Sequence, residues 1–307
     1  ADTEASSVID LIIYGKELAT ELMGIAPNNQ LFLFGYSQGG HATMAAVKEI
    51  EANYSDKLTI TASCPMAGPY SMSGAQRLML ESGAPYPNPG YLPYVLFAYD
   101  KIYNLYDNID DVLLYPYNNN LFPLYDGTYN MWEINYTMWE IGEELYGIPE
   151  QEFTPIQIFQ DEYYEEYLSN DNHPFKLALA DNDVYNFTPQ SNMMLFHCSG
   201  DDNVAYENSQ IAYDYFIENG AENIQLEDLG NFNHTDCASF AILGAKIWID
   251  TMADLCELTS INESRAQSKE MIKQIDFLGR DIEKNTFNQN IISIYSDGSF
   301  QKRLKIQ

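Results

Sequence analysis

The sequence predicts an α/β fold in which a mostly parallel sheet is flanked by helices. Three apolar runs support this prediction, at residues 31–34, 193–198 and 224–229, because each has strand-like composition and leads through a polar turn or loop into a helical pattern. This repeated order favours parallel strands whose carboxyl ends lie at one edge of the sheet.

The remaining elements follow in chain order. Apolar positions that recur every three or four residues predict a helix over residues 3–23, which Gly24 ends. A β-rich run predicts a further strand over residues 58–62. After the two later strands, helices are predicted over residues 208–219 and from the end of the last polar loop to about Leu258.

The first apolar run leads into Gly35-Tyr36-Ser37-Gln38-Gly39, a Gly-x-Ser-x-Gly pattern between a strand and a helix. This context predicts a sharp turn that exposes the Ser37 hydroxyl, with Gly35 and Gly39 required because side chains there would collide with neighbouring backbone. The Gln38 N–H, at the helix start, would face a developing oxyanion. The alternative is a strand-to-helix turn without chemistry.

Acidic and histidine residues follow the two later strands. The loop after the strand at 193–198 contains Asp201 and Asp202, and the loop after the last strand contains His234. Parallel strands would place both loops at the edge that carries Ser37, so the pattern predicts a nucleophile, an acid and a general base. Asp201 is preferred as the acid, with Asp202 left open.

Position separates His234 from the other three histidines. His41 lies in the helix after Ser37 and is expected to point away from the site. His173 lies beside Pro174 and is expected at the surface. His197 lies within a strand and is expected to fix the loop that carries Asp201.

Residues 84–185 differ from the rest of the chain in composition. Tyrosine and tryptophan are frequent, prolines divide the segment into short pieces, and apolar clusters at 94–98 and 138–141 predict short helices. We interpret the segment as an inserted helical cap whose aromatic side chains form a pocket wall over the site. Alternatively, those side chains form a mutual core.

The chain has 307 residues and a formal charge of −30 that is unevenly spread. Residues 264–307 have a net charge of +3, against −33 for residues 1–263, and this shift indicates a boundary. The strong negative charge argues against nucleic acid or an anionic membrane surface as a partner.

The three loops also carry a resemblance to a known family. The motifs Gly-Tyr-Ser-Gln-Gly-Gly, Gly-Asp-Asp-Asn-Val and Asn-His-x-x-Cys resemble those of α/β-hydrolases of the secretory-lipase type, bacterial relatives of fungal secretory lipases. The resemblance covers residues 1 to about 258. It implies a partial α/β-hydrolase fold with an inserted helical cap, and carboxylester hydrolysis with His234 as base and Asp201, in an Asp-x-x-Val frame with Val204, as acid.

In the fold that the resemblance implies, several strands precede the serine turn, and a loop among them supplies a second oxyanion donor. Only about 30 residues precede the first predicted strand here. We therefore expect the chain to be the carboxyl-terminal part of a hydrolase whose first strands are absent.

Residues 259–307 are predicted to form a small β-rich tail. Strand-like alternation occurs over 269–280 and 291–306, with a turn at Asp297-Gly298. The Asp-x-x-Gly-Arg and Tyr-x-Asp-Gly-x-x-x-Lys-Arg motifs in these segments resemble the carboxyl-terminal sorting domain of proteins exported by the type IX secretion route of Bacteroidetes-like bacteria. The alternative is a small hairpin that completes the main fold.

The predicted organisation is therefore an α/β core over residues 1–83 and 186–258, a cap over 84–185, and a sorting or anchoring tail over 259–307.

Cysteine positions agree with export. Cys198 lies three residues before the predicted acid and Cys237 three residues after the predicted base, so a disulfide between them is expected in an oxidising compartment. Cys64 and Cys256 either form a second bridge or stay free. No spacing resembles a zinc site, and no cofactor is expected. The run Asp-Asn-Ile-Asp-Asp at residues 107–111 could bind calcium but lacks the ligand series of a known loop, so a solvated turn is expected there.

The preferred function is a secreted or cell-surface bacterial serine esterase or lipase that acts on small-molecule or lipid esters through an acyl-enzyme. The secretion machinery is the expected partner of the tail. The alternatives are a serine peptidase on the same fold and a non-catalytic surface protein that binds carbohydrate or peptide through the cap.

Overall fold

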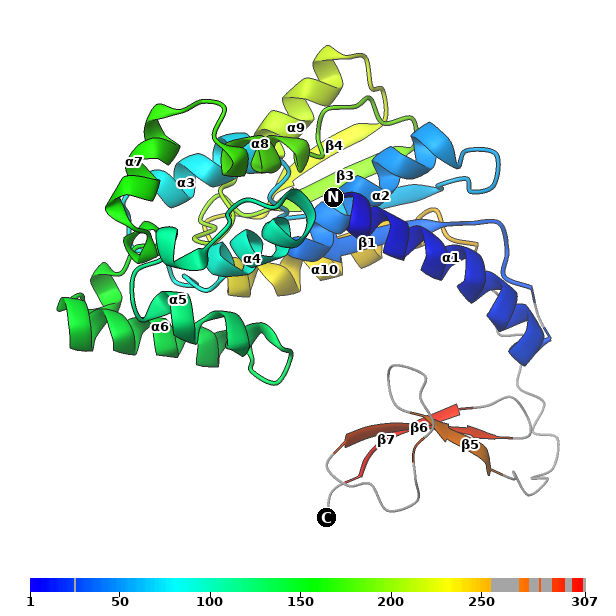
Figure 1. Cartoon of the computed structure of the whole chain (residues 1–307). Helices are drawn as coiled ribbons and strands as arrows, with labels where there is room; N and C mark the ends of the chain where they lie inside the picture. The colour runs from blue at the N-terminus through cyan, green and yellow to red at the C-terminus, as the bar shows by residue number, and fades with distance from the viewer. Residues whose placement is uncertain (25, 255–270, 276–281, 283–288, 296–299, 306–307) are drawn as a thin grey trace. The chain divides into compact units, whose positions relative to one another are not determined.

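A computed structural model describes residues 1–24, 26–254, 271–275, 282, 289–295 and 300–305 (Figure 1). The chain divides into two compact units, one made of Ala1–Ile9 and Asn29–Ala253 and the other of Asp10–Asn28 and Asp254–Gln307. Each unit contains one β-sheet. None of the helices in the described ranges combines the length and the apolar composition needed to cross a membrane.

The first unit contains a four-stranded parallel sheet in the order β1-β2-β3-β4. Its strands are β1 (Phe32–Tyr36), β2 (Ala62–Met66), β3 (Asn192–His197) and β4 (Ile224–Asp228). The parallel sheet and the strands β1, β3 and β4 confirm the predictions from the sequence.

The prediction for the second strand was wrong. A strand was expected over residues 58–62, but β2 begins at Ala62, and residues 58–60 have no regular structure. The Thr61 N–H donates to Leu31 O at 2.8 Å, and the register then pairs Ala62 with Phe32. Pairing with β1 therefore outweighed the local β propensity of the threonine-rich run. Because of this register, β2 ends with Met66 paired to Tyr36, the residue before Ser37.

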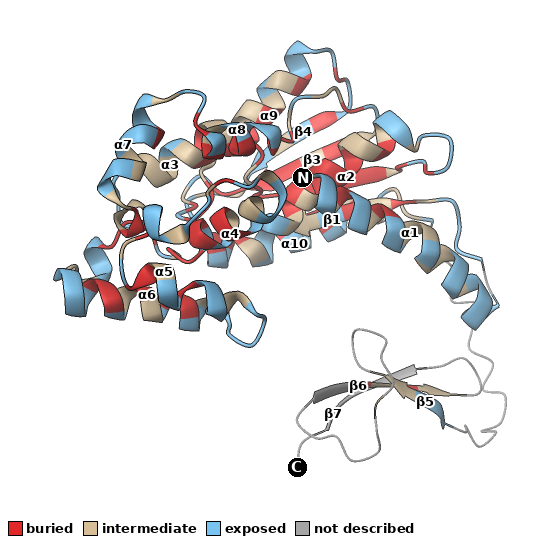
Figure 2. Ribbon diagram, in the orientation of Figure 1, coloured by how far each residue is buried: buried red, intermediate tan, exposed pale blue. Residues whose placement is uncertain are grey.

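Helices α2 (Gln38–Asn53) and α10 (His234–Asp250) cover opposite faces of the sheet. Side chains alternate between the two faces of a strand. Gly35 faces α2, since a Cβ on it would lie 2.2 Å from Gly39 O. The other face packs against α10 in a buried apolar cluster made of Cys64, Met66, Phe196, Ala241, Ala245 and Ile249. Figure 2 shows the buried residues concentrated on the sheet and on the helix faces next to it.

The other helices of the predicted core are also present. They are α1 (Asp2–Met23) and α9 (Glu207–Glu218), which packs on β3 and β4. Helix α10 begins earlier than predicted because Asn233 caps it, accepting a hydrogen bond from the Asp236 N–H at 2.8 Å. It ends at Asp250 instead of near Leu258, and residues 255–258 lie outside the described ranges.

The segment between β2 and β3 consists of short helices, grouped to one side of the sheet in Figure 1. They are η1 (Met72–Gln76), α3 (Arg77–Glu81), α4 (Tyr91–Tyr103), η2 (Ile109–Asp111), α5 (Tyr117–Asn120), η3 (Phe122–Tyr125), α6 (Met131–Tyr146), η4 (Glu150–Glu152), η5 (Pro155–Ile158), α7 (Asp161–Ser169) and α8 (Pro174–Asp181). This segment has its own hydrophobic cluster, in which aromatic residues such as Tyr117, Phe153 and Phe175 are buried. The short helices predicted around residues 94–98 and 138–141 lie within α4 and α6.

The second unit contains a three-stranded antiparallel sheet in the order β5-β6-β7. Its strands are β5 (Met271–Ile275), β6 (Gln289–Tyr295) and β7 (Phe300–Lys305). These strands confirm that the tail is rich in β structure. The Asp297-Gly298 turn and the Asp-x-x-Gly-Arg motif (Asp276, Gly279 and Arg280) lie outside the described residues.

Candidate active site

Ser37 occupies a strained turn between β1 and α2. Its φ of 60° and ψ of −124° are rare for a residue with a side chain, and such conformations cost of order 1–3 kcal/mol. The Ser37 N–H donates to Met66 O at 2.9 Å, which ties the turn to β2. The side chain makes no capping hydrogen bond to α2, so the hydroxyl remains available for other partners.

The prediction about the glycines of this turn was half right. A Cβ on Gly35 would overlap the Gly39 carbonyl, as expected, but a Cβ on Gly39 would meet nothing within 4 Å. The second crowded position is instead Gly40, where a Cβ would lie 2.4 Å from Met66 O. The helix turns residue 40 towards β2 and residue 39 away from it, a difference of one position that the motif does not reveal.

The structure brings Ser37, His234 and Asp201 into one hydrogen-bonded series. His234 Nε2 lies 2.8 Å from Ser37 Oγ, and His234 Nδ1 lies 2.6 Å from Asp201 Oδ2. Because an ionised carboxylate only accepts hydrogen bonds, Nδ1 carries the proton and Nε2 accepts from the serine hydroxyl. An imidazole held in this way can take a proton from a serine hydroxyl that attacks a carbonyl.

Asp201 is held as an ionised acceptor. Its side chain is fully buried, and burial alone would favour the neutral form of the acid. The opposing effect is stronger: hydrogen bonds from His197, His234 and the Val204 N–H hold the pKa of Asp201 well below its usual range. The Asn203 N–H also donates to Asp201 Oδ1, at 2.9 Å. A charged carboxylate is therefore fixed against His234 Nδ1.

The other histidines lie close to this site or are buried elsewhere. His197 Nε2 lies 3.0 Å from Val204 O and 3.3 Å from Asp201 Oδ2, so it holds the acid loop as expected. His41 is buried, with Nδ1 2.7 Å from Glu4 Oε2 and Nε2 3.0 Å from Asn182 O, so both ring nitrogens contact residues outside the series of Ser37, His234 and Asp201. It also contributes to the wall of the cavity on which Ser37 opens.

His173 was predicted incorrectly, at the surface. It is only 3% exposed, because its Nδ1 accepts from the Phe175 N–H and caps helix α8 instead of facing solvent.

Two residues that the sequence did not single out as supports hold the backbone of His234. Asp202, predicted only as an alternative acid, accepts from the His234 N–H at 3.1 Å. The Tyr36 hydroxyl donates to His234 O at 2.6 Å, and burial together with Asp201 and Asp202 raises the pKa of Tyr36. The residue before the serine and the residue after the acid could have been considered from their positions in the motifs, but nothing in their residue types indicates these partners.

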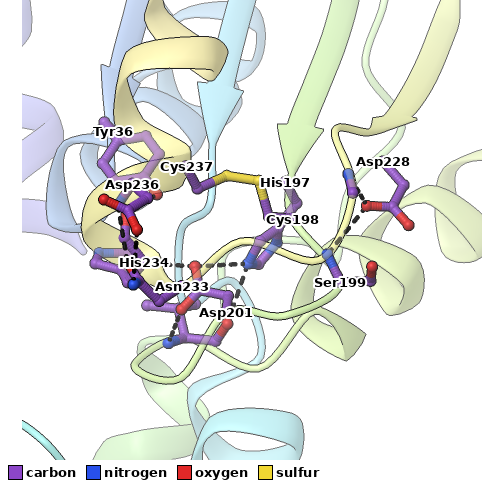
Figure 3. The surroundings of a disulfide bond; sticks show 12 residues. Tyr36, His197, Cys198, Ser199, Asp201, Asp228, Asn233, His234, Asp236 and Cys237 are labelled. Atoms are coloured by element: carbon purple, nitrogen blue, oxygen red, sulfur yellow. Dashed lines mark hydrogen bonds and ion pairs between the residues drawn. A yellow bond between two sulfur atoms is a disulfide. The ribbon is translucent and has the colours of Figure 1, made fainter.

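A disulfide joins the ends of the two loops, as predicted from the spacing. Cys198, after β3, is bonded to Cys237 in α10, with their Cα atoms 6.0 Å apart (Figure 3). Asp228 connects the same loops through its Oδ1, which accepts from the Ser199 N–H at 3.0 Å and the Gly230 N–H at 2.9 Å. The acid loop and the His234 loop are therefore linked covalently and by hydrogen bonds.

The remaining two cysteines were left open between a second bridge and free thiols. Cys64 is a buried free thiol, whose burial raises its pKa to about 12, and Cys256 lies outside the described residues.

Ser37 opens on a cavity of about 790 Å³ between the sheet edge and the segment inserted after β2. Gln38 lies in its wall at the first position of α2, where a backbone N–H has no partner within the helix. The walls are mostly apolar and include eight tyrosines: Tyr36, Tyr86, Tyr91, Tyr94, Tyr99, Tyr103, Tyr164 and Tyr167. Tyrosines of the inserted segment thus serve both in its own core and in the wall of this cavity. Within the described part of the chain, no group of three His, Cys, Asp or Glu side chains is arranged to hold a metal ion.

No protein-family model and no curated protein sequence matches this chain. Solved structures do match. A rice cell wall degrading esterase, LipA of Xanthomonas oryzae, has a TM-score of 0.68 and 26% identity, over 81% of this chain and 66% of the esterase. A Legionella pneumophila protein assigned as a hydrolase has a TM-score of 0.70 and 23% identity, over 85% of this chain and 65% of that protein.

A more distant likeness is to lipase A of Candida antarctica in its closed state, with a TM-score of 0.50 and 11% identity over 76% of this chain and 51% of the lipase. The chain thus spans slightly less than two thirds of the length of the bacterial structures that it matches. The parallel sheet, the strained serine turn between strand and helix, and these likenesses together show that the chain has an α/β-hydrolase fold.

Proposed function

We propose that this chain is a serine carboxylester hydrolase with Ser37 as nucleophile, His234 as general base and acid, and Asp201 as the residue that orients His234. The observation that carries the proposal is the hydrogen-bonded series from Ser37 Oγ through His234 to Asp201, at the wall of a cavity of about 790 Å³. The likeness to an esterase at 26% identity supports the same reaction class.

The reaction has two steps, acylation of Ser37 and hydrolysis of the acyl-enzyme. Ser37 Oγ attacks the ester carbonyl while His234 Nε2 takes the hydroxyl proton, and the Gln38 N–H donates to the oxyanion that forms. His234 then gives that proton to the departing alcohol, which leaves an acyl group on Ser37. Water attacks the acyl-enzyme while His234 Nε2 takes its proton, and His234 then returns this proton to Ser37 Oγ as the bond to the acyl group breaks and the carboxylic acid leaves.

The composition of the cavity wall favours an acyl chain as the part of the substrate that binds there. Its aliphatic walls include Leu80, Leu92 and Val95, and the tyrosine rings add further apolar surface. Burial of apolar surface contributes about 0.8 kcal/mol for each methylene group. We therefore expect medium or long acyl esters to be better substrates than acetates.

The test is hydrolysis of nitrophenyl esters from acetate to palmitate, with a matched nitroanilide and with Ser37→Ala as the control. We expect kcat/KM to rise with chain length to a limit set by the cavity, and Ser37→Ala to remove activity. Preference for the anilide would point to a peptidase instead. Absence of turnover of any ester by the folded chain would contradict the proposal and favour a binding protein.

We further propose that the enzyme is exported by a bacterium, with the tail as its sorting signal. The disulfide between Cys198 and Cys237 suits an oxidising compartment, and the antiparallel strands β5, β6 and β7 suit a separate tail. The test is a reporter fused to residues 254–307 in a bacterium that uses the type IX route. Surface display should require the tail, and display of the reporter without it would contradict this role.

A further inference from the structure

A chain of amide side chains joins the inserted segment to the loop that carries Asp202. Asn135 of α6 donates from Nδ2 to Asn88 Oδ1 at 2.7 Å, and Asn88 donates from Nδ2 to Asn203 Oδ1 at 2.6 Å. Asn203 in turn donates from Nδ2 to Asp202 Oδ1 at 2.8 Å. The same Asp202 oxygen accepts from the His234 N–H, so the chain connects α6 with the backbone of His234.

The direction of each bond in this chain is fixed from both ends. The Gly90 N–H donates to Asn135 Oδ1 at 2.9 Å, so the NH₂ group of Asn135 must face Asn88. At the other end, Asp202 Oδ1 accepts from the His234 N–H, and an oxygen that acts as an acceptor requires the NH₂ group of Asn203 to face it. Both constraints give the same orientation for the Asn88 side chain. The donors and acceptors along this series of amide side chains therefore have one consistent assignment.

Asn203 is the residue where these contacts meet. Its N–H donates to Asp201 Oδ1, while its carbonyl oxygen accepts from the Tyr86 hydroxyl at 2.7 Å and from Gln76 Nε2 at 3.0 Å. Asn203 is only 3% exposed, so a lost hydrogen bond would not be replaced freely by one to water. Three side chains of the segment between β2 and β3 therefore hold one residue that contacts both Asp201 and Asp202.

We propose that Asn88 and Asn203 are positioning residues that couple the inserted segment to the geometry of Ser37, His234 and Asp201. This inference rests on the proposed function. Asn88 fixes the side chain of Asn203, which fixes the acid loop and, through Asp202, the backbone of His234. The same segment lines the cavity, so a substrate that moves it also acts on the alignment of His234 with Ser37.

Removing the hydrogen bond between Asn88 and Asn203 should lower the reactivity of Ser37, although Asn88 itself does not contact the substrate. In Asn88→Asp, Oδ1 still accepts from Asn135, but the side chain has no NH₂ group for Asn203. Asn88→Ala removes the same bond without adding a charge. The matched control is Asn130→Asp, the same exchange at the start of α6, where an aspartate oxygen still accepts from the Glu133 N–H.

The experiment measures the second-order rate constant for fluorophosphonate labelling of Ser37, normalised to the folded fraction seen by circular dichroism. We expect both Asn88 variants to label at least about tenfold more slowly, because small misplacements of reacting groups reduce rates strongly. Asn130→Asp should label at the wild-type rate. With a short ester, kcat per folded molecule should fall in the Asn88 variants while KM stays unchanged. Partial unfolding would also lower the apparent kcat, so this rate is normalised to the folded fraction as well.

The proposal is overturned if both Asn88 variants label at the wild-type rate, or if only the aspartate variant is slow, since the effect would then come from its charge. If the Asn88 variants do not fold, Asn135→Asp removes the hydrogen bond from Asn135 to Asn88 Oδ1. Its labelling rate, compared with that of Asn130→Asp, then tests the coupling. Labelling without ester turnover in the wild type would refute the ester hydrolase alone, and the variant rates would still decide the coupling. An unlabelled wild-type chain would refute both proposals.

Discussion

Asp201 and Asp202 are neighbours with different partners, and the sequence favoured Asp201 as the acid without excluding Asp202. Asp201 Oδ2 lies 2.6 Å from His234 Nδ1, whereas Asp202 accepts from the backbone N–H of His234. Only Asp201 can hold the imidazole tautomer and stabilise its positive charge. The difference arises because the loop conformation directs the two carboxylates to different partners. The residue type, aspartate in both cases, gives no information about that direction.

We predict that Asp201→Asn lowers kcat by roughly 10³–10⁴-fold, because the amide cannot stabilise the imidazolium and favours the wrong tautomer. Asp202→Asn should lower kcat by less than about tenfold, since its Oδ1 still accepts the same hydrogen bonds. Ester kinetics of the two variants check this directly. Equal losses in both would mean that the roles of the two carboxylates are not separate.

At the scale of one element, the packing of α2 on β2 depends on a single glycine. We predict that Gly40→Ala lowers the free energy of unfolding by about 1–3 kcal/mol or more, because its Cβ would overlap the Met66 carbonyl. Gly39→Ala should raise it by about 0.4–1 kcal/mol, since nothing lies within 4 Å and alanine favours a helix. Urea unfolding of both variants measures the difference, and a larger loss at Gly39 would contradict the structure.

The disulfide is the second feature at this scale. It closes a loop with a sequence separation of 39, so Cys198→Ser with Cys237→Ser should lower stability by roughly 2–5 kcal/mol. A reducing agent should lower the melting temperature of the wild type and leave that of the double variant unchanged. A wild-type melting temperature that does not respond to full reduction would show that the bridge contributes nothing.

Local patterns predicted most elements because their signals lie within a few residues. The run before Ser37, the strand ending at His197 and the helix at 207–218 all formed close to the predicted positions. The second strand was misplaced because its position depends on pairing with β1, which is a long-range contact. The series of hydrogen bonds from Asn135 to Asp202 could not be predicted, because Asn135, Asn88 and Asn203 lie far apart in the sequence and asparagine is common in loops.

On the scale of the whole molecule, the net charge of −30 is the dominant electrostatic feature. Like charges repel in the folded state, and salt screens them beyond about 10 Å at 0.1 M. We therefore predict that the melting temperature at pH 7 rises when sodium chloride is increased from 10 to about 300 mM. A falling melting temperature would show that attractive ion pairs, such as that between Arg77 and Glu81, outweigh the repulsion.

The two units have different sheets, and the candidate site lies in the first of them. The site residues Ser37, Asp201 and His234 all belong to that unit, as do the residues that line the cavity. Removal of residues 254–307 should therefore leave ester hydrolysis unchanged, as measured by kcat/KM. Loss of activity in a folded truncated chain would assign the tail a part in the site.

Fluorophosphonate labelling, read by intact mass, reports whether Ser37 is an activated nucleophile. With Ser37 assigned as the nucleophile, we expect one adduct per chain, located by peptide mapping on Ser37, absent in Ser37→Ala and strongly slowed in His234→Ala. A folded wild-type chain that gains no adduct, or an adduct that persists in Ser37→Ala, would contradict it.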